Sequence, residues 1–378
     1  MKTLSYGRQW INDDDIAEIV KVLKGDWLTM GPTVDAFEKS LSDYAGVKHA
    51  VTFSSGTAAL HGAMHASGMG RGDMAVTTAM TFVATSNSVI YTGATPIFAD
   101  IDETFCMNPS EAEKVIQSHG GKVKAIVPVS FGGYPFDMRP FRELADKYHA
   151  VLIEDASHAW GGDRESRKIG FDADMTTLSF HPVKHITTAE GGAVLTNDDN
   201  YARKLRMFRN HGTTRSESEF VDKPNGIWHS EMQELGYNYR LSEIHCALGL
   251  SQMKRLDEFV ERRREIAEIY FNELSGVEGV TLPPKKDGHA WHLFIVRVKE
   301  ELHSQFFMYL RDNDIRLQVH YRPVPLQPYY RKKFGYKAGD FPEAEKYYRQ
   351  AVSLPMYPLM TDDDVLRVSE CIKNFAWR

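Results

Sequence analysis

A lysine at position 184 lies in the segment 179–192 (SFHPVKHITTAEGG), directly after a predicted strand and between apolar and small residues. Partial desolvation at such a place would lower the pKa of the amine and make it nucleophilic. An amine of this kind could condense with an aldehyde. Most lysines are solvated surface groups, however, so Lys184 gains meaning only from the residues that accompany it.

An acidic pair, Glu154 and Asp155, ends an apolar run and is followed closely by His158. A carboxylate at the end of a strand could pair with a cationic ring nitrogen or with a metal. On position alone, a helix cap is the more common role for Asp155. For His158, the plain alternative is a packed, hydrogen-bonded side chain.

The segment 54–60 (SSGTAAL) follows a predicted strand and opens a predicted helix. Its amide groups, a hydroxyl and the helix dipole would together favour a phosphate group. The motif is weak by itself, because many small-residue turns between a strand and a helix bind nothing.

A phosphate turn, a strand-end aspartate and a lysine, in this order, are the parts that a pyridoxal 5′-phosphate site requires. Lys184 would hold the cofactor as a Schiff base, and Asp155 would keep the pyridine nitrogen protonated, so that the ring acts as an electron sink. Phe82, at the end of another predicted strand, offers a partner for the face of the ring. Without the other parts, Phe82 would be interpreted as an ordinary core residue.

An alternation of helices and strands is predicted to position these residues. Short apolar runs that predict strands occur at 50–53, 74–77, 96–98, 125–129, 151–153 and 177–180. Such alternation predicts an α/β fold with a mainly parallel sheet covered by helices. Ligands in sheets of this kind bind at the carboxyl ends of the strands.

The length of the chain suggests more than one domain. A long charged stretch at 241–269 has helical spacing and is expected to link two domains. Strands expected at 292–298 and 317–321, with a closing helix at 363–375, predict a smaller α+β domain. We therefore place a large domain, which includes the N-terminal segment, at 1–250 and a small domain at 251–378.

The composition excludes several classes of protein. With 42% hydrophobic and 25% charged residues, the chain is neither disordered nor fibrous. A net charge of −6 and scattered basic residues argue against a nucleic-acid surface. No apolar stretch approaches the roughly 20 residues of a membrane helix, and no signal peptide is evident. Three separated cysteines without metal-ligand spacing fit a reducing compartment, so we expect a cytoplasmic protein that binds no metal.

Five ordered segments resemble those of sugar-nucleotide aminotransferases of the DegT/StrS type, which have the aspartate aminotransferase (type I) fold. The segments are SGTAAL at 55–60, TFVAT at 81–85, EDASH at 154–158, the segment 179–192 and GYNYRL at 236–241. The resemblance covers nearly the whole chain. It implies a large domain with a mainly parallel, seven-stranded type of sheet, pyridoxal phosphate as the cofactor, and a homodimer with shared active sites.

Residue by residue, the resemblance implies that Gly56, Thr57 and Ser179 bind the cofactor phosphate and that Phe82 stacks on the ring. It also implies that Asn238 reaches the phosphate of the cofactor in the partner subunit.

For the reacting groups, the resemblance implies that Asp155 faces the pyridine nitrogen, that His158 lies near the hydroxyl side of the ring, and that Lys184 forms the internal aldimine. One branch of the family has a histidine in place of the lysine and carries out a dehydration. Counting from both ends of the segment 179–192 places Lys184, and not His185, at the aldimine position, which argues against that branch.

Three blocks suggest the substrate: 179–192, NHG at 210–212 and VHYRP at 319–323. They most resemble enzymes of the pseudaminic acid pathway, which aminate C4 of a UDP-linked 4-keto-6-deoxy-N-acetylhexosamine. The amino donor implied is L-glutamate. Family members with similar motifs use 3-keto sugars or TDP- and GDP-linked sugars, and these remain alternatives.

His211, His320 and Tyr321 are candidates for contacts with the sugar or its diphosphate. A Tyr-Arg-Pro corner can also exist only to turn the chain. Arg240 could offer a forked donor to a phosphate or carboxylate, or it could form a surface ion pair.

Two other functions share part of this pattern. An NAD-dependent oxidoreductase would share the alternating sheet, but the segment 54–60 lacks the expected G-x-G-x-x-G turn. A catalytically inactive regulatory protein could retain the fold and the cofactor, although intact Lys184 and Asp155 weigh against it.

Overall fold

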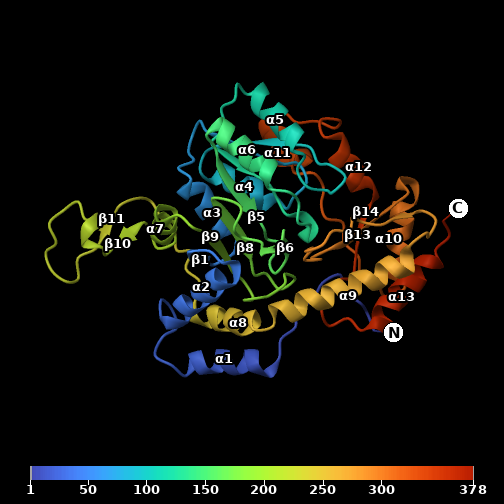
Figure 1. The fold of residues 1–378 in the computed structure, drawn as a ribbon, viewed down its shortest axis with the longest axis horizontal. Coiled ribbons are helices and arrows are strands. Elements are labelled where there is room, and N and C mark those ends of the chain that lie inside the picture. Colours follow the sequence, from blue (N-terminus) through green and yellow to red (C-terminus); the bar gives the residue numbers. More distant parts are fainter. Residues whose placement is uncertain (1, 378) are drawn as a thin grey trace.

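The computed structural model describes residues 2–377, and its centre is a seven-stranded sheet with the strand order β1-β9-β8-β5-β4-β2-β3 (Figure 1). The strands are β1 (His49–Phe53), β2 (Met74–Thr78), β3 (Thr95–Ala99), β4 (Ala125–Val127), β5 (Val151–Asp155), β8 (Met175–Ser179) and β9 (Gly192–Thr196). Strand β9 is antiparallel to both of its neighbours, and all other pairs are parallel. The predicted α/β class with a mainly parallel sheet is confirmed.

Helices cover both faces of this sheet, which is why its strands have continuous apolar runs. Ala125 and Ile153 belong to the apolar cluster on one face, whereas Ile126 and Leu152 belong to the cluster on the other. The first face is covered by α3 (Gly56–Ala66), α4 (Val83–Tyr91) and α7 (Asp199–Phe208). The second is covered by α2 (Pro32–Ala45), α5 (Pro109–Ser118), α6 (Arg139–Tyr148) and α8 (Glu243–Met253).

A second, antiparallel sheet has the strand order β12-β13-β14 and lies beside α9 and α13 (Figure 1). Its elements are β12 (Val280–Thr281), β13 (Phe294–Val298), β14 (Ala351–Leu354), α9 (Leu256–Leu274), α10 (His303–Asp312) and α13 (Asp362–Lys373). The two sheets lie on either side of residue 250 in the sequence. The division into domains at that residue stays a prediction.

Two sequence predictions about these elements were wrong. The stretch 241–269 forms two helices, α8 and α9, because the chain breaks at Lys254 and Arg255. The segment 317–321 is no regular strand, since only Gln318 pairs with Ser353 of β14. The chain then leaves that sheet, and the N–H of Val324 donates to the carbonyl of Ala79 at 2.9 Å.

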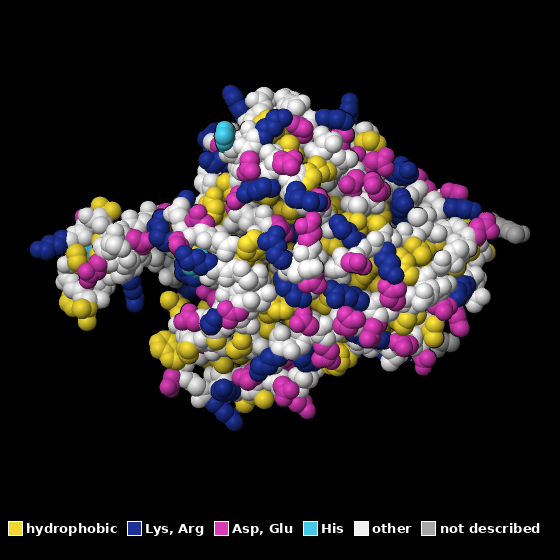
Figure 2. Space-filling view, in the orientation of Figure 1, with side chains coloured by type: hydrophobic (Ala, Val, Ile, Leu, Met, Phe, Trp, Pro, Cys, Tyr) yellow, Lys and Arg dark blue, Asp and Glu magenta, His cyan; other side chains and the backbone are white. Residues whose placement is uncertain are grey.

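Residues 213–235 form an arm that stands clear of the body and includes β10 (Thr213–Thr214) and β11 (Glu231–Met232) (Figures 1 and 2). Its large apolar side chains are exposed to solvent: Val221, Ile227, Trp228, Met232 and Leu235. The remaining elements are α1 (Asp13–Leu23), α11 (Pro328–Phe334), α12 (Pro342–Gln350), β6 (Asp163–Arg164) and β7 (Arg167–Lys168), with short 3-10 turns. Among residues 2–377, no helix has the length and apolar character needed to cross a bilayer.

Candidate active site

A cavity of about 490 Å³ lies at the carboxyl ends of β5 and β8, beside the N-termini of α3 and α4. Most of the residues singled out from the sequence line it: Gly56, Thr57, Phe82, Asp155, His158, Ser179, Lys184, His320 and Tyr321. The fold thus brings together side chains from five separate segments of the chain. The roles assigned to these residues stay predictions.

Lys184 projects from the loop between β8 and β9 and is partly buried. The loop is closed by backbone hydrogen bonds from Phe180 to Gly191 and from Thr188 to Phe180. Desolvation lowers the pKa of the Lys184 amine to about 8, and the positive charge of Arg263 acts in the same direction, whereas Asp155 opposes both. At neutral pH the amine therefore has a neutral, nucleophilic fraction far larger than that of a surface lysine.

Asp155 is the last residue of β5, and its carboxylate lines the cavity. Oδ2 accepts a hydrogen bond from the Thr85 hydroxyl at 2.7 Å, and Oδ1 accepts one from the Ser157 N–H at 3.1 Å. No helix follows β5 directly, so the helix-cap interpretation of Asp155 is wrong. A carboxylate held by two donors is instead suited to a cationic partner in the cavity.

His158 is buried, and its Nδ1 accepts a hydrogen bond from the N–H of Gly132 at 3.3 Å. Burial lowers the pKa of His158 well below its usual value, and the charge of Lys184 adds to this effect. A neutral ring that accepts at Nδ1 carries its proton on Nε2. The turn at Gly132, which donates to His158, also bonds to the segment before β13, because the N–H of Leu293 donates to the carbonyl of Gly132 at 3.2 Å.

The start of α3 forms the predicted phosphate turn. The Ser55 side chain caps the helix by accepting from the N–H of Ala58 at 3.1 Å, while the amides at the first positions have no partner within the helix. A Cβ added to Gly56 would lie 2.8 Å from Cβ and 2.9 Å from Oγ of Ser179. Glycine thus allows the helix end and the Ser179 hydroxyl to share one anion-sized space.

Phe82 lies at the rim of the cavity with 54% of its surface exposed, which rules out the alternative of an ordinary core residue. Its ring centroid is 5.7 Å from that of Tyr321. Tyr321 follows His320, whose Nδ1 contacts the Ser353 hydroxyl at 2.8 Å. Burial lowers the pKa of His320 to about 3, so its ring is neutral and can donate or accept hydrogen bonds in the cavity.

Three of the predicted residues do not line this cavity within one chain. His211 and Arg240 line a separate groove of about 810 Å³ at the base of the arm. Arg240 donates to Oδ1 of Asn210 at 2.6 Å, so its predicted alternative of a surface ion pair is not observed among residues 2–377. Asn238 pairs with Asn210 through the backbone. The groove carries a net excess of basic side chains, since its walls also contain Arg203, Arg206, Arg209 and Arg215 against Asp35 and Glu219.

Several cavity residues were not predicted. Tyr6 reaches the cavity because the N-terminal segment bonds to residues next to the small sheet: Leu4 pairs with Ile315, and the Tyr6 carbonyl accepts from the N–H of Met356 at 3.0 Å. Thr85 holds Asp155 from the first turn of α4, and Gln318 comes from the segment beside β14. Thr85 lies in the segment 81–85 and Gln318 in the expected strand 317–321, but neither side chain gave a separate signal in the sequence.

Comparison with known proteins identifies the class. The chain belongs to the DegT/DnrJ/EryC1/StrS aminotransferase family, whose model matches residues 9–373. It is therefore an aminotransferase, and enzymes of this family depend on pyridoxal phosphate. The family predicted from the sequence is confirmed.

Individual proteins resemble the chain over almost its whole length. It is 40% identical over 381 residues to the spore coat polysaccharide biosynthesis protein SpsC of Bacillus subtilis, covering 99% of this chain and 97% of the relative. It is 36% identical over 374 residues to a UDP-4-amino-4,6-dideoxy-N-acetyl-beta-L-altrosamine transaminase of Campylobacter jejuni, covering 98% and 96%. The structure of Helicobacter pylori PseC, an aminotransferase involved in the biosynthesis of pseudoaminic acid, matches with a TM-score of 0.90 at 31% identity and covers 98% of both chains.

Proposed function

We propose that this aminotransferase holds pyridoxal 5′-phosphate through Lys184 and moves an amino group from L-glutamate to C4 of a UDP-linked 4-keto-6-deoxy-N-acetylhexosamine. The observation that carries the cofactor assignment is the convergence of Lys184, Asp155 and the turn at Gly56 in one cavity. The substrate assignment is supported by the names of the Campylobacter and Helicobacter proteins.

The residues of the cavity fit the cofactor at each of its ends. The unpaired amides at Gly56 and Thr57, with the Ser179 hydroxyl, suit a phosphate. The Asp155 carboxylate, at the other side, suits a protonated ring nitrogen. A cavity of about 490 Å³ is large enough for a small-molecule site. When bound, pyridoxal phosphate supplies a protonated ring that withdraws electrons from the substrate carbon.

The chain's own residues then have separate tasks. Lys184, whose pKa of about 8 lies near the operating range, is suited to take a proton from a substrate carbon and to return it. Asp155 holds the proton on the ring nitrogen. The neutral ring of His158 can donate through Nε2 to the hydroxyl side of the cofactor. Phe82, at the rim of the cavity, would cover one face of a bound ring and limit the access of water.

We further propose a homodimer in which Asn238, His211 and Arg240 complete the site of the partner subunit. Two observations support this. Among residues 2–377, no arginine lines the Lys184 cavity, although a nucleotide diphosphate needs cationic partners. The basic groove that holds Arg240 lies at the base of an arm whose exposed apolar side chains suit an interface. His320 and Tyr321 would contact the sugar from within the same chain.

The test is a panel of keto-sugar nucleotides offered with L-glutamate, followed through the formation of 2-oxoglutarate. We expect turnover with the UDP-linked 4-keto sugar and none with Lys184→Ala. Turnover only with 3-keto or with TDP- or GDP-linked sugars would replace the substrate assignment. A purified protein that gains no visible absorbance band with pyridoxal phosphate, or keeps its band in Lys184→Ala, would contradict the assignment of Lys184 itself.

A further inference from the structure

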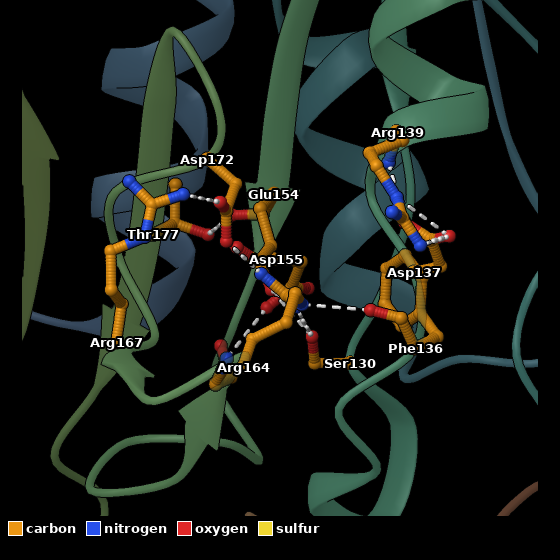
Figure 3. Close-up of polar contacts among 11 residues, drawn as sticks. Ser130, Phe136, Asp137, Arg139, Glu154, Asp155, Arg164, Arg167, Asp172 and Thr177 are labelled. Atoms are coloured by element: carbon orange, nitrogen blue, oxygen red, sulfur yellow. Dashed lines mark hydrogen bonds and ion pairs between the residues drawn. The ribbon is translucent and has the colours of Figure 1, made fainter.

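Glu154, the residue before Asp155 in β5, forms a buried ion pair with Arg164 (Figure 3). Glu154 and Asp155 are consecutive residues of β5, so their side chains extend to opposite faces of the sheet. Asp155 lines the cavity, whereas Glu154 has no exposed surface. Oε1 of Glu154 accepts hydrogen bonds from Nη2 of Arg164 at 2.8 Å and from the hydroxyl of Ser130 at 2.5 Å.

Arg164, on β6, donates hydrogen bonds from all three guanidinium nitrogens, to Glu154, Phe136 and Asp172. Its Nε donates to the carbonyl of Phe136 at 2.7 Å, and its Nη1 donates to Oδ2 of Asp172 at 2.5 Å. The guanidinium also lies over the ring of Phe136, 5.3 Å from the centroid. Only 7% of Arg164 is exposed. Although burial opposes its charge, Glu154 and Asp172 raise the pKa of Arg164, so it is a permanent cation.

Ser130 connects the Glu154–Arg164 ion pair to the backbone of Asp155. Its hydroxyl bonds to Glu154, and its backbone N–H donates to the carbonyl of Asp155 at 3.0 Å. The N–H of Asp155 in turn donates to the carbonyl of Pro128 at 2.9 Å. Two residues beyond Ser130, the N–H of Gly132 donates to Nδ1 of His158. The backbone that positions Asp155 and the donor that orients His158 are thus parts of one short segment.

A gain in folding stability does not explain this buried ion pair, because the desolvation of two buried charges costs about as much free energy as their attraction provides. Oε2 of Glu154 even lacks a hydrogen-bond partner among residues 2–377. What the network does provide is fixed geometry, since a bidentate or tridentate guanidinium admits few arrangements of its partners.

We propose that the Glu154–Arg164 ion pair, acting through Ser130, is a positioning device that fixes the Asp155 carboxylate and the His158 ring against the bound cofactor. This inference rests on the proposed function, because it needs a cofactor that those two side chains would hold. Within residues 2–377, the lining of the cavity does not include Glu154, Arg164 or Ser130. Their effect is on how tightly, and in which orientation, the ring is held.

The chain offers a matched control a short distance away. Arg139 pairs with Asp137 through Nη2 and Oδ2 at 2.7 Å, and its Nε contacts the same carboxylate, but 71% of its side chain is exposed (Figure 3). Arg139→Met therefore removes an Arg–Asp pair near Phe136 without touching Ser130 or Glu154. An exposed pair contributes little to stability.

The experiment compares Arg164→Lys, Ser130→Ala and Arg139→Met with the wild type. Each protein is freed of cofactor and titrated with pyridoxal phosphate, and both the dissociation constant and the circular dichroism of the visible cofactor band are recorded. Arg164→Lys keeps the charge but cannot make three hydrogen bonds in a plane. We expect it to weaken cofactor binding about tenfold and to reduce the circular dichroism per bound cofactor. Ser130→Ala should change both in the same direction, and Arg139→Met should stay within about twofold of the wild type.

The melting temperature of each cofactor-free protein separates positioning from stability. If Arg164→Lys and Ser130→Ala lower the melting temperature but leave the dissociation constant and the circular dichroism like those of Arg139→Met, the network is only structural and the inference is overturned. Should Arg164→Lys fail to fold, Ser130→Ala alone decides between these results. A wild-type protein that develops no visible band would overturn the proposed function and this inference together, whereas a wild-type band unaffected by either variant overturns this inference alone.

Discussion

The hydroxyl of Thr85 donates a hydrogen bond of 2.7 Å to Oδ2 of Asp155, and the Thr81 hydroxyl lies 2.8 Å from the same Thr85 oxygen. Because Thr81 can donate to Thr85, the hydroxyl of Thr85 is free to direct its own proton to the carboxylate. The start of α4 therefore orients the group that we expect to hold the cofactor ring.

Thr85→Val should loosen this orientation while preserving the shape of the helix. A hydrogen bond to a charged group contributes about 1.5–3 kcal/mol, so we expect cofactor binding to weaken by about tenfold or more. The measurement is a titration of the visible cofactor band. Thr92→Val is the control, since Thr92 lies at the end of the same helix and its hydroxyl donates to the carbonyl of Val89 at 2.8 Å. Equal affinities in the two variants would remove Thr85 from the site.

The rate at which the cofactor-free protein binds pyridoxal phosphate should depend on pH through Lys184. Only the neutral amine is a nucleophile, so the rate should rise as pH increases through about 8 and then level off. A solvated lysine would give a midpoint near its usual value of about 10.4. Following the growth of the visible band over a pH series measures this midpoint.

Two neighbouring charges should move that midpoint in opposite directions. Asp155 favours the protonated amine, so Asp155→Asn should shift the midpoint to lower pH. Arg263 is buried, and its hydrogen bonds to the part of the chain that the structure describes go only to carbonyls, those of Trp291, His292 and Met356. Its charge disfavours a second cation, so Arg263→Met should shift the midpoint to higher pH, and Arg263→Lys should restore it. An unchanged midpoint in both Asp155→Asn and Arg263→Met would show that desolvation acts alone.

Gly56→Ala should disturb the phosphate turn by overpacking. The new methyl group would lie 2.8 Å from Cβ of Ser179, and such crowding costs about 1–3 kcal/mol. We expect that decrease in the free energy of unfolding in urea, together with weaker cofactor binding. At Gly70 an added Cβ meets nothing within 4 Å, so Gly70→Ala should change neither property. A Gly56→Ala protein that binds cofactor normally would place the phosphate elsewhere.

Shared active sites can be tested by complementation between two inactive chains. In a mixed dimer of Lys184→Ala and Asn238→Ala chains, one site receives both substitutions and the other receives neither. With equal co-expression and random pairing, we expect about a quarter of the wild-type number of cofactor sites. Each variant expressed alone provides the baseline. Mixed dimers that form, as shown by two affinity tags, but stay at that baseline would contradict the exchange of Asn238.

The positions of the main site residues could be predicted because they end or closely follow short, largely buried strands. Asp155 and Ser179 end apolar runs, and the carboxyl ends of parallel strands meet at one edge of a sheet. For Lys184 and Gly56, the resemblance of the segments 179–192 and 55–60 to those of a known family supplied a second signal. Neither signal depends on contacts distant in the sequence.

Residues that reach the site through long-range contacts could not be predicted in this way. Tyr6 enters the cavity because Leu4 pairs with Ile315, a relationship that no local pattern encodes. The break between α8 and α9 has a similar cause, since Arg255 donates to Oδ2 of Asp15 at 2.6 Å and packs over the ring of Trp10. A helical period alone would continue through that position. The placement of His211 and Arg240 away from Lys184 likewise depends on the arm, whose direction the sequence does not reveal.

The turn at Gly132 and Gly133 bonds to His158 on one side and to Ala290 and Leu293 on the other. A side chain at Gly133 would collide with the carbonyl of His158, so this position cannot hold a larger residue unless the backbone moves. The orientation of the His158 ring consequently depends on the segment before β13 as well as on the turn after β5. Substitutions that reduce activity should therefore cluster around His158 and in the segment before β13, two regions that are far apart in sequence. Engineering of the β12-β13-β14 sheet will need to preserve the hydrogen bonds between these regions.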